Sequence, residues 1–309
     1  MTNKISKTIY IQTTRYLINI AKIIEDILIK NNYNTKIVDA VGVDRSIKSN
    51  NEPDYYIFLF IWHIQELPRN AEFYIYNLEQ ANYYIDFPFL HPPCNDHETR
   101  IVTEAFNKAK KIFDYSRENL LRYPNKIRDR CYHLPIALRT NLESLPITNT
   151  EKEYDILFFG SLTERRKKIF YFLTTKTPLR IKFVRNKTGL YGKNLYEEIQ
   201  RARIILNIHA KQVSLIETAR IHDCLREGQT IIVSEDSEID KDTVELYKEI
   251  VNFAPCIKED LSNIYDFLLV VKKFLNINDY QEYYKNIETN ILSLNRNINE
   301  LYTNTFNLT

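Results

Sequence analysis

The stretch from Tyr154 to Asp236 constrains the fold most, because short apolar runs alternate in it with segments of helical period. It begins with an apolar run that ends at Gly160 and is followed by the basic segment 161–168. Further strands are expected at 180–185, 203–209 and 230–234. Strands that alternate with helices predict βαβ units and a parallel sheet. The carboxyl ends of such strands share one edge, where open α/β sheets bind their ligands.

The first 140 residues carry the same alternation of strand-like and helix-like segments. Strands are expected at 8–12, 34–41, 55–62, 73–78, 111–115 and 131–134, and helices at 16–29, 98–110 and 117–123. The run 55–62 is apolar at nearly every position, which is typical of a strand buried on both faces of a parallel sheet.

The polar segment 141–153, which contains a proline and has no period, is expected to be a linker. A chain of 309 residues suits two domains of about 150 residues each. The sequence therefore predicts an α/β protein with two Rossmann-like, doubly wound domains. An N-terminal domain would cover 1–140, and a C-terminal domain would cover 154–309 and end in two long helices.

Composition argues against several classes of protein. A formal net charge of +2 gives no general attraction to nucleic acid or to anionic membranes. The four cysteines lie far apart with no CxxC pair, as expected of reduced thiols rather than of a disulfide or zinc scaffold. No apolar run reaches the ~18 residues of a membrane span, and the N-terminus lacks the apolar core of a signal peptide. These features predict a cytoplasmic protein without a transmembrane segment.

Gly160 stands where the first strand of the C-terminal domain must turn into a helix. A residue without Cβ lets the backbone approach a ligand, and the helix N-terminus that starts near Ser161 suits a phosphate. Arg165 and Arg166 add guanidinium groups that can bind a diphosphate. The structural alternative is a plain turn with a capping box, since Ser161 and Glu164 fit the S-x-x-E pattern.

Glu217 is expected in the first turn of a helix over 214–227, at the same edge of the sheet. A carboxylate there can accept hydrogen bonds from the vicinal hydroxyls of a ribose. Arg220 follows three residues later, where it can orient the carboxylate or reach a phosphate. The alternative is again a capping box, formed by Ser214 and Glu217.

Histidines and loop carboxylates supply the remaining candidates. His209 ends the strand 203–209 and can project beside Lys211 toward a sugar or a diphosphate. His63 and Glu79 follow two strands of the N-terminal domain and are the groups best placed to meet an acceptor, with Glu79 a possible general base. The other histidines have no partner at metal-ligand spacing, so no metal site is predicted.

The segments 155–168, 202–209 and 217–221 together resemble the C-terminal domain of GT-B glycosyltransferases, above all the group that includes the spore-maturation CgeB-like proteins. A looser likeness extends through 76–80 and 133–135. The resemblance implies two Rossmann-like domains that face a central cleft, with the C-terminal helices packing back across it. It implies a nucleotide-sugar donor, a UDP- or GDP-sugar, on the C-terminal domain and an acceptor on the N-terminal domain. No bound metal or other cofactor is expected.

Carried over residue by residue, the resemblance places the donor diphosphate near Gly160, Ser161 and Arg165. It places the ribose at Glu217, and the donor sugar or the phosphates at His209, Lys211 and Arg220. One departure matters, because many retaining GT-B enzymes carry two glutamates with seven residues between them, and here the first position is His209. Retaining or inverting chemistry is therefore unassigned.

Three functions remain open from the sequence. The leading hypothesis is transfer of a sugar to a hydroxyl of a glycan, a glycoprotein or a small molecule. The second is a DNA-base glycosyltransferase, which the near-neutral charge does not favour. The third is a catalytically degenerate GT-B protein that only binds. An epimerase of the same fold is less favoured, because no acid/base pair stands near the expected sugar position.

Overall fold

The structure is a computed structural model, and it describes residues 8–14, 17–39, 55–59, 67, 72–80, 96–138, 151–184, 193–227, 230–277 and 279–305. The chain divides into two compact units. Unit 1 comprises Met1–Thr140 together with Asn297–Thr309, and unit 2 comprises Asn141–Arg296. The predicted candidate His63 lies outside the described residues.

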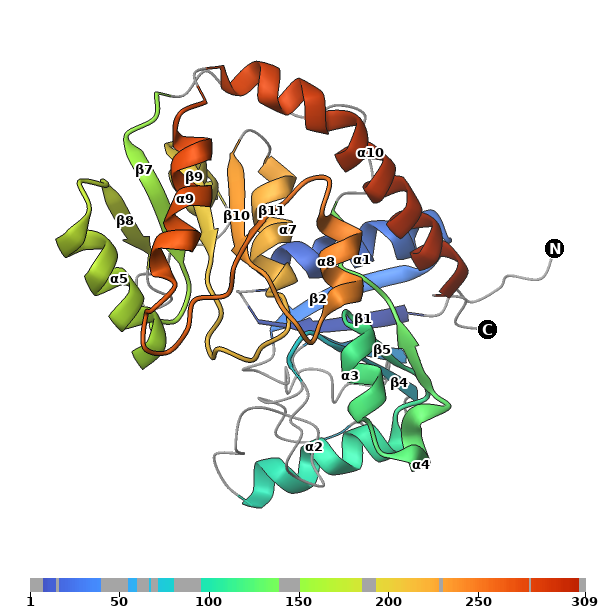
Figure 1. Cartoon of the computed structure of the whole chain (residues 1–309). Coiled ribbons are helices and arrows are strands. Elements are labelled where there is room, and N and C mark those ends of the chain that lie inside the picture. Colours follow the sequence, from blue (N-terminus) through green and yellow to red (C-terminus); the bar gives the residue numbers. More distant parts are fainter. Residues whose placement is uncertain are drawn as a thin grey trace. The chain divides into compact units, whose positions relative to one another are not determined.

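Unit 1 contains a six-stranded sheet in the order β2-β1-β3-β4-β5-β6, with every neighbouring pair parallel. The strands are β1 (Thr8–Thr13), β2 (Asn34–Asp39), β3 (Tyr55–Phe58), β4 (Glu72–Asn77), β5 (Ile112–Asp114) and β6 (Cys131–His133). The helices are α1 (Ile18–Lys30), α2 (Asp96–Lys108), α3 (Arg117–Arg122) and α4 (Asn125–Arg128). Figure 1 shows α1 on one side of this sheet and α2 on the other.

The core of unit 1 is rich in aromatic side chains. All four residues of β3 are buried, as the apolar run predicts, and Phe58 packs edge-on against Phe73 of β4. Helix α2 buries Val102 and Phe106 against this face of the sheet. Tyr302, near the end of α10 (Tyr280–Thr305), is fully buried in the same unit and donates a hydrogen bond of 2.8 Å to the Tyr76 hydroxyl.

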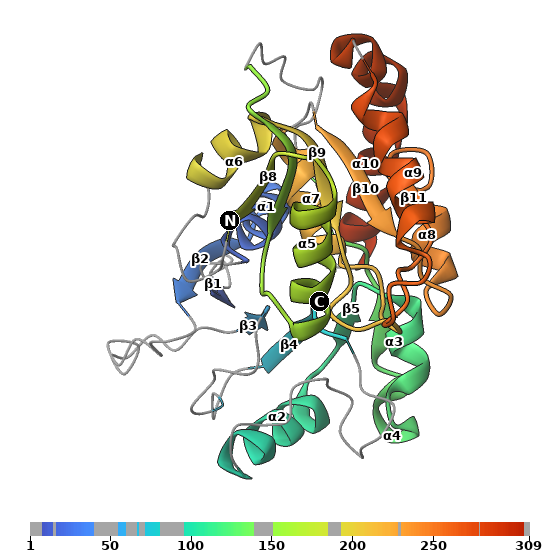
Figure 2. The same ribbon diagram turned by 60° about the vertical axis from the view of Figure 1, so that its left-hand side comes forward.

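Unit 2 contains a five-stranded parallel sheet in the order β11-β10-β9-β7-β8. The strands are β7 (Tyr154–Phe159), β8 (Ile181–Val184), β9 (Ala202–Asn207), β10 (Ile231–Glu235) and β11 (Asn252–Ala254). The helices are α5 (Glu164–Lys176), α6 (Lys193–Gln200), α7 (Thr218–Glu227), α8 (Lys241–Tyr247), α9 (Ile264–Leu275) and the greater part of α10. Figure 2 shows α5 in front of the sheet of unit 2.

Alternate residues of the central strands of unit 2 face the two sides of the sheet. Phe158, Leu206 and Val233 pack against α5 and α9 in one core cluster. Along each strand, the neighbouring side chains point to the opposite face of the sheet, where α6 and α7 pack against β9. The predicted fold class is thereby confirmed, with two doubly wound parallel sheets in one chain.

Several predicted boundaries differ from the structure. Helix α7 begins at Thr218, so Glu217 lies just before the helix and Ser214 does not cap it. Helix α5 begins at Glu164 with Thr163 as its N-cap, so the capping box expected at Ser161 is absent; the Thr163 hydroxyl accepts the Arg166 amide instead. The sequence also assigns the whole C-terminus to the second domain, whereas 297–305 packs with unit 1.

Among the described residues, no helix is both long enough and apolar enough to cross a membrane.

Candidate functional site

The carboxyl edge of the unit 2 sheet has a point where the strand order reverses. From β7 the chain passes through α5 to β8 on one side, and then through α6 to β9 on the other side of β7. The loops after β7 and β9 therefore separate at this edge, and such a switch point is where doubly wound sheets bind ligands. Gly160 follows β7 directly, and 208–217 connects β9 to α7.

Gly160 allows a close approach between the backbone and an arginine. Its φ is +132°, a backbone conformation that residues other than glycine rarely adopt. Its amide donates to the Val184 carbonyl at 3.0 Å. A Cβ on this residue would lie 2.9 Å from Nη2 of Arg220. From the sequence, the missing Cβ is expected to leave room for a ligand. In the structure, the Arg220 guanidinium lies next to the position that a Cβ would occupy.

Glu217 lies between two arginines. Its Oε2 accepts Nη2 of Arg220 at 2.7 Å, and its Oε1 accepts Nη2 of Arg166. The two guanidinium groups are buried, whereas the Glu217 side chain is 24 % exposed. Burial alone would raise the pKa of Glu217, but Arg220 and Arg166 outweigh it and hold the pKa below its usual value. Glu217 is therefore an ionised, oriented acceptor with one face open to solvent.

Arg220 is fixed by three further contacts. Its Nε donates to the Phe159 carbonyl at 3.0 Å, and its Nη1 donates to Oδ1 of Asn207 at the end of β9. The guanidinium also lies 4.8 Å from the centre of the Phe158 ring. The arginine is thus tied to both strands of the switch point and to Glu217.

Arg166 is held as firmly as Arg220. Its Nε and Nη2 donate to the Ile208 carbonyl at 2.9 and 2.6 Å, and its Nη1 donates to the Ser161 carbonyl at 2.9 Å. Burial lowers the pKa of Arg166 to about 10, so the group stays charged at neutral pH. From the sequence, Arg166 is expected to bind a diphosphate beside Arg165, and its contact with Glu217 was not predicted.

Arg165 points into unit 2 and not toward the open face of Glu217. Its guanidinium is 5 % exposed and forms a two-pronged ion pair with Glu235, at 2.5 and 3.0 Å. It also donates to the carbonyls of His209 and Ile257, at 2.9 and 2.5 Å. Glu235 in turn accepts the amides of the same two residues, at 2.6 and 2.8 Å. This pair therefore fastens the loops after β9 and β11 to each other.

His209 is 1 % exposed, so its ring lies beneath the edge and not on it. Its Nε2 lies 3.2 Å from the Asp236 carbonyl, and burial lowers the pKa of the imidazole, which keeps it neutral. Its Nδ1 has no hydrogen-bond partner in the described part of the chain. Ser161 and Lys211, by contrast, are exposed.

The carboxyl edge of the unit 1 sheet carries Glu79, which is half-buried just after β4. Both of its peptide groups bond to the side chain of Asn77: the Glu79 amide donates to Oδ1 at 3.2 Å, and the Glu79 carbonyl accepts Nδ2 at 2.8 Å. No pattern in the sequence predicts this arrangement. Within the described ranges, no group of three or more His, Cys, Asp or Glu side chains could hold a metal ion.

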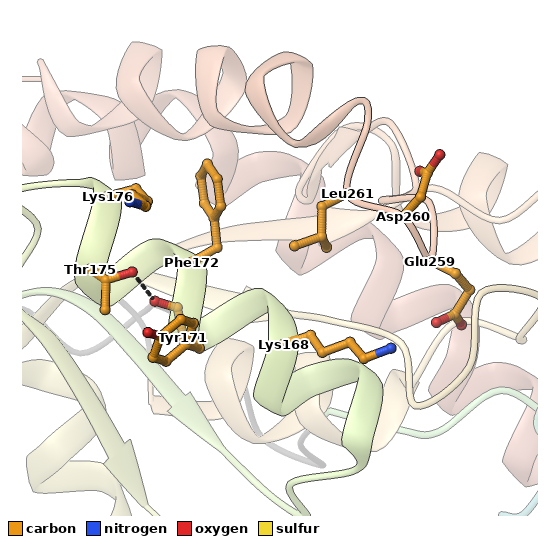
Figure 3. A pocket seen from close by; sticks show the side chains of 8 residues that line it. All are labelled: Lys168, Tyr171, Phe172, Thr175, Lys176, Glu259, Asp260 and Leu261. Carbon is orange, nitrogen blue, oxygen red and sulfur yellow. Dashed lines mark hydrogen bonds between the residues drawn. The ribbon is translucent and has the colours of Figure 1, made fainter.

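A pocket of about 330 Å³ lies on the outer side of α5 and contains none of the predicted site residues (Figure 3). Its lining comprises Lys168, Tyr171, Phe172, Thr175, Lys176, Glu259, Asp260 and Leu261. It is therefore separate from the cluster around Glu217.

No protein-family model matches the chain, and no curated protein matches it. Solved structures do. Sucrose-phosphate synthase from Thermosynechococcus elongatus superposes with a TM-score of 0.59 at 9 % identity, over 98 % of this chain and 100 % of that one. The N-terminal domain of trehalose-6-phosphate phosphatase from Candida albicans gives 0.53 at 11 % identity, over 99 % and 97 %. A UDP-forming α,α-trehalose-phosphate synthase from Burkholderia xenovorans gives 0.51 at 7 % identity, over 98 % of both chains.

Identities this low establish a shared fold and nothing narrower. The chain has the α/β fold of the GT-B glycosyltransferases, with two parallel-sheet, Rossmann-like domains.

Proposed function

We propose that the protein is a glycosyltransferase that moves a sugar from a nucleotide-diphosphate sugar, a UDP- or GDP-sugar, to a hydroxyl acceptor. Unit 2 would bind the donor, unit 1 the acceptor, and the acceptor would be a glycan, a glycoprotein or a small molecule. The likeness to the CgeB-like group belongs to this proposal and rests on the sequence segments that carry it.

One observation carries the proposal. Glu217 is a carboxylate at the switch point of unit 2, with each oxygen held by a buried arginine and about a quarter of its side chain exposed. Each carboxylate oxygen can accept more than one hydrogen bond, so the open face can still accept two hydroxyl groups. Vicinal hydroxyls of a ribose match this arrangement, since they donate side by side.

The exposed groups of the loops after β7 and β9 suit a diphosphate. Ser161 lies just before the positive N-terminus of α5, and Lys211 is an exposed ammonium in the loop after β9. A departing nucleoside diphosphate carries its charge on the phosphates, and cations held near it stabilise that charge in the transition state. We assign this charge stabilisation to Lys211, and a hydrogen bond to a phosphate oxygen to the hydroxyl of Ser161. The Gly160 amide is already bonded to the Val184 carbonyl, so Gly160 contributes the turn and not a donor.

Arg165, Arg220 and His209 fit a supporting role better than direct contact with the donor. The Nη atoms of Arg165 are engaged with Glu235 and two carbonyls, and the ring of His209 is covered. Arg220 holds Glu217 at the edge. In this proposal the three residues fix the loops that present Glu217 and Lys211 to the nucleotide.

A protein that binds without catalysis is the second candidate. It is favoured by the internal pairing of all three arginines and by His209 at the position where retaining enzymes of this fold carry a glutamate. This candidate predicts nucleotide binding with no turnover, so the two functions separate in an assay.

The test is calorimetric titration of the protein with UDP, GDP, CDP and their sugars, each beside its 2′-deoxyribose analogue. We expect one ribonucleotide to bind, and its 2′-deoxy analogue to bind about tenfold more weakly, a loss of ~1.4 kcal/mol. Glu217→Gln should weaken the ribonucleotide and leave the deoxy analogue nearly unchanged. Glu245→Gln, on an exposed glutamate of α8, is the matched control.

The comparison of a ribonucleotide with its 2′-deoxy analogue needs only the wild-type protein. A folding defect in the Glu217→Gln variant therefore does not affect whether recognition of the 2′-hydroxyl is detected. Equal affinity of the wild-type protein for the ribonucleotide and its 2′-deoxy analogue would show that Glu217 does not bind the ribose 2′-hydroxyl. If the protein binds none of the nucleotides, the glycosyltransferase proposal fails. If it binds one and does not consume the corresponding nucleotide sugar with any acceptor or with water, the binding protein is the better description.

A further inference from the structure

A carboxylate is buried at the carboxyl edge of the unit 1 sheet. Asp114, the last residue of β5, is 0 % exposed and accepts hydrogen bonds from four groups. The Asn77 Nδ2 donates at 2.8 Å, the Tyr123 hydroxyl at 2.6 Å, the Ser116 amide at 2.9 Å and the Asn119 Nδ2 at 3.0 Å. In the described part of the chain, no lysine, arginine or histidine forms an ion pair with it. Such a carboxylate is stabilised by dipoles alone.

The two asparagines that donate to Asp114 also hold Glu79. Nδ2 of Asn77 donates both to Asp114 and to the Glu79 carbonyl, and its Oδ1 accepts the Glu79 amide at 3.2 Å. Nδ2 of Asn119 donates to the same carbonyl at 2.9 Å. Both peptide groups of Glu79 are therefore bound by side chains that are themselves bound to Asp114.

The orientation of the Asn77 amide depends on Asp114 being an acceptor. An ionised carboxylate only accepts hydrogen bonds, so it requires the NH₂ end of Asn77 to face it. The oxygen end must then face the Glu79 amide, as it does. With a donor in place of the carboxylate, the amide would turn over, and its oxygen would meet the Glu79 carbonyl.

We propose that Asp114 is a positioning residue: through Asn77 and Asn119 it fixes the backbone of Glu79, and so holds the Glu79 carboxylate where an acceptor hydroxyl can reach it. This inference rests on the proposed function, in which Glu79 is the candidate general base. Asp114 itself touches no substrate.

Burial makes the arrangement sensitive to protons. It raises the pKa of Asp114 to about 7, although Tyr123, Asn77, Ser116 and Asn119 act in the opposite direction. The titratable groups that interact with Asp114 are Tyr123 and Cys131, and burial together with Asp114 raises the pKa of both. Each of them is therefore uncharged at neutral pH, and Asp114 is the group of this cluster that changes charge there.

The test combines hydrogen exchange with kinetics on the full-length protein. In Asp114→Asn, the Glu79 amide should exchange at least tenfold faster, while the amides of β4 remain protected. For turnover of the nucleotide sugar that the titration identifies, kcat should fall at least tenfold and the donor KM should stay within twofold. Asp129→Asn, on an exposed aspartate of the same unit, should change neither.

A double variant separates positioning from general damage. If Asp114 acts through Glu79, the pair Asp114→Asn with Glu79→Gln should be no slower than Glu79→Gln alone. Tyr123→Phe serves if Asp114→Asn folds poorly, because it keeps the carboxylate and both asparagines. It removes one donor from the carboxylate, so the acid limb of the pH–kcat profile should move to higher pH.

Unchanged exchange at Glu79 in Asp114→Asn overturns the positioning role, whether or not a nucleotide binds. An additive double variant, or wild-type kcat in Asp114→Asn, overturns it as well. A wild-type protein that binds no nucleotide overturns the proposed function instead, which is a different result from either.

Discussion

The two sheets each end a central strand with a buried carboxylate, and the two carboxylates are neutralised in different ways. Glu235 at the end of β10 receives both prongs of Arg165 and two backbone amides. Within the described residues, Asp114 at the end of β5 receives two side-chain amides, a phenol and one backbone amide, but no cation. Both are 0 % exposed.

The difference shows what a counter-ion does for a buried acid. Glu235 and Arg165 form a salt bridge that joins the loops after β9 and β11, and each partner makes the other tolerable inside the protein. Asp114 keeps its charge only through dipoles, so burial brings its pKa to about 7. The first arrangement is a fixed scaffold, whereas the second can respond to pH near neutrality.

The largest expected effect comes from removing the cation of the first pair. Arg165→Met would leave Glu235 buried and unpaired, and breaking a buried pair on one side costs about 3–5 kcal/mol of unfolding free energy. Urea unfolding followed by circular dichroism measures the loss. The control is Arg180→Met, whose salt bridge to Asp155 is exposed and should contribute less than about 1 kcal/mol. Equal losses for the two variants would show that the Arg165–Glu235 ion pair does not hold the loops after β9 and β11 together.

Gly160→Ala should have the next largest effect. The residue has a positive φ, and the new methyl carbon would lie 2.9 Å from the Arg220 guanidinium. Strain of this kind costs about 1–3 kcal/mol. Because Arg220 orients Glu217, nucleotide affinity should also fall, and titration of the variant measures this. A variant that loses stability but binds the nucleotide normally would show that Arg220 can move without disturbing Glu217.

Asp114→Asn tests the other carboxylate and should show a smaller effect that depends on pH. The folded-state pKa of Asp114 is about 7, above the usual value of an unfolded aspartate, so the native state holds an extra proton between these limits. The contribution of Asp114 to the free energy of unfolding is fully present below the pKa that it has in the unfolded state. It is lost as pH rises toward about 7.

The substitution should therefore cost about 1–2 kcal/mol at pH 5, where hydrogen bonds are lost, and less at pH 8, where the wild-type carboxylate is charged without a counter-ion. Urea unfolding at the two pH values measures both costs, with Asp129→Asn as the control. A cost that is larger at pH 8 than at pH 5 would mean that the pKa of Asp114 is lowered and not raised.

The sequence predicted the fold and the edge of the sheet, because both depend on local patterns. Apolar runs alternating with amphipathic segments identify a parallel sheet, and Gly160 directly after such a run marks the turn at its edge. The contact between Glu217 and Arg220 was predicted because the two residues lie three positions apart in the chain.

These local patterns do not predict which charged side chains pair when they lie far apart in the sequence. Arg165 and Arg166 are neighbours in a basic run, and the sequence treats them alike, yet one points to Glu235, 70 positions away, and the other to Glu217. Successive side chains on a helix point in different directions, so only the helix's position against the sheet decides which arginine meets which acid. The buried carboxylates did leave a local sign, since each ends an apolar strand: Ile112-Phe-Asp114 and Ile231-Ile-Val-Ser-Glu235.

The response of the two carboxylates to pH joins the comparison to function. Burial acts to raise the pKa of Glu217, but Arg220 and Arg166 hold it below its usual value, so nucleotide affinity should stay constant from about pH 8 to about pH 5. Asp114 takes up a proton below about pH 7, so kcat should fall over the same range, by up to about tenfold per pH unit. Titration and turnover measured across this range test the pair of expectations together. If affinity and kcat fall in parallel, one ionisation governs both steps, and the contrast between a charge fixed by arginines in unit 2 and a charge held by dipoles in unit 1 does not govern how the protein responds to pH.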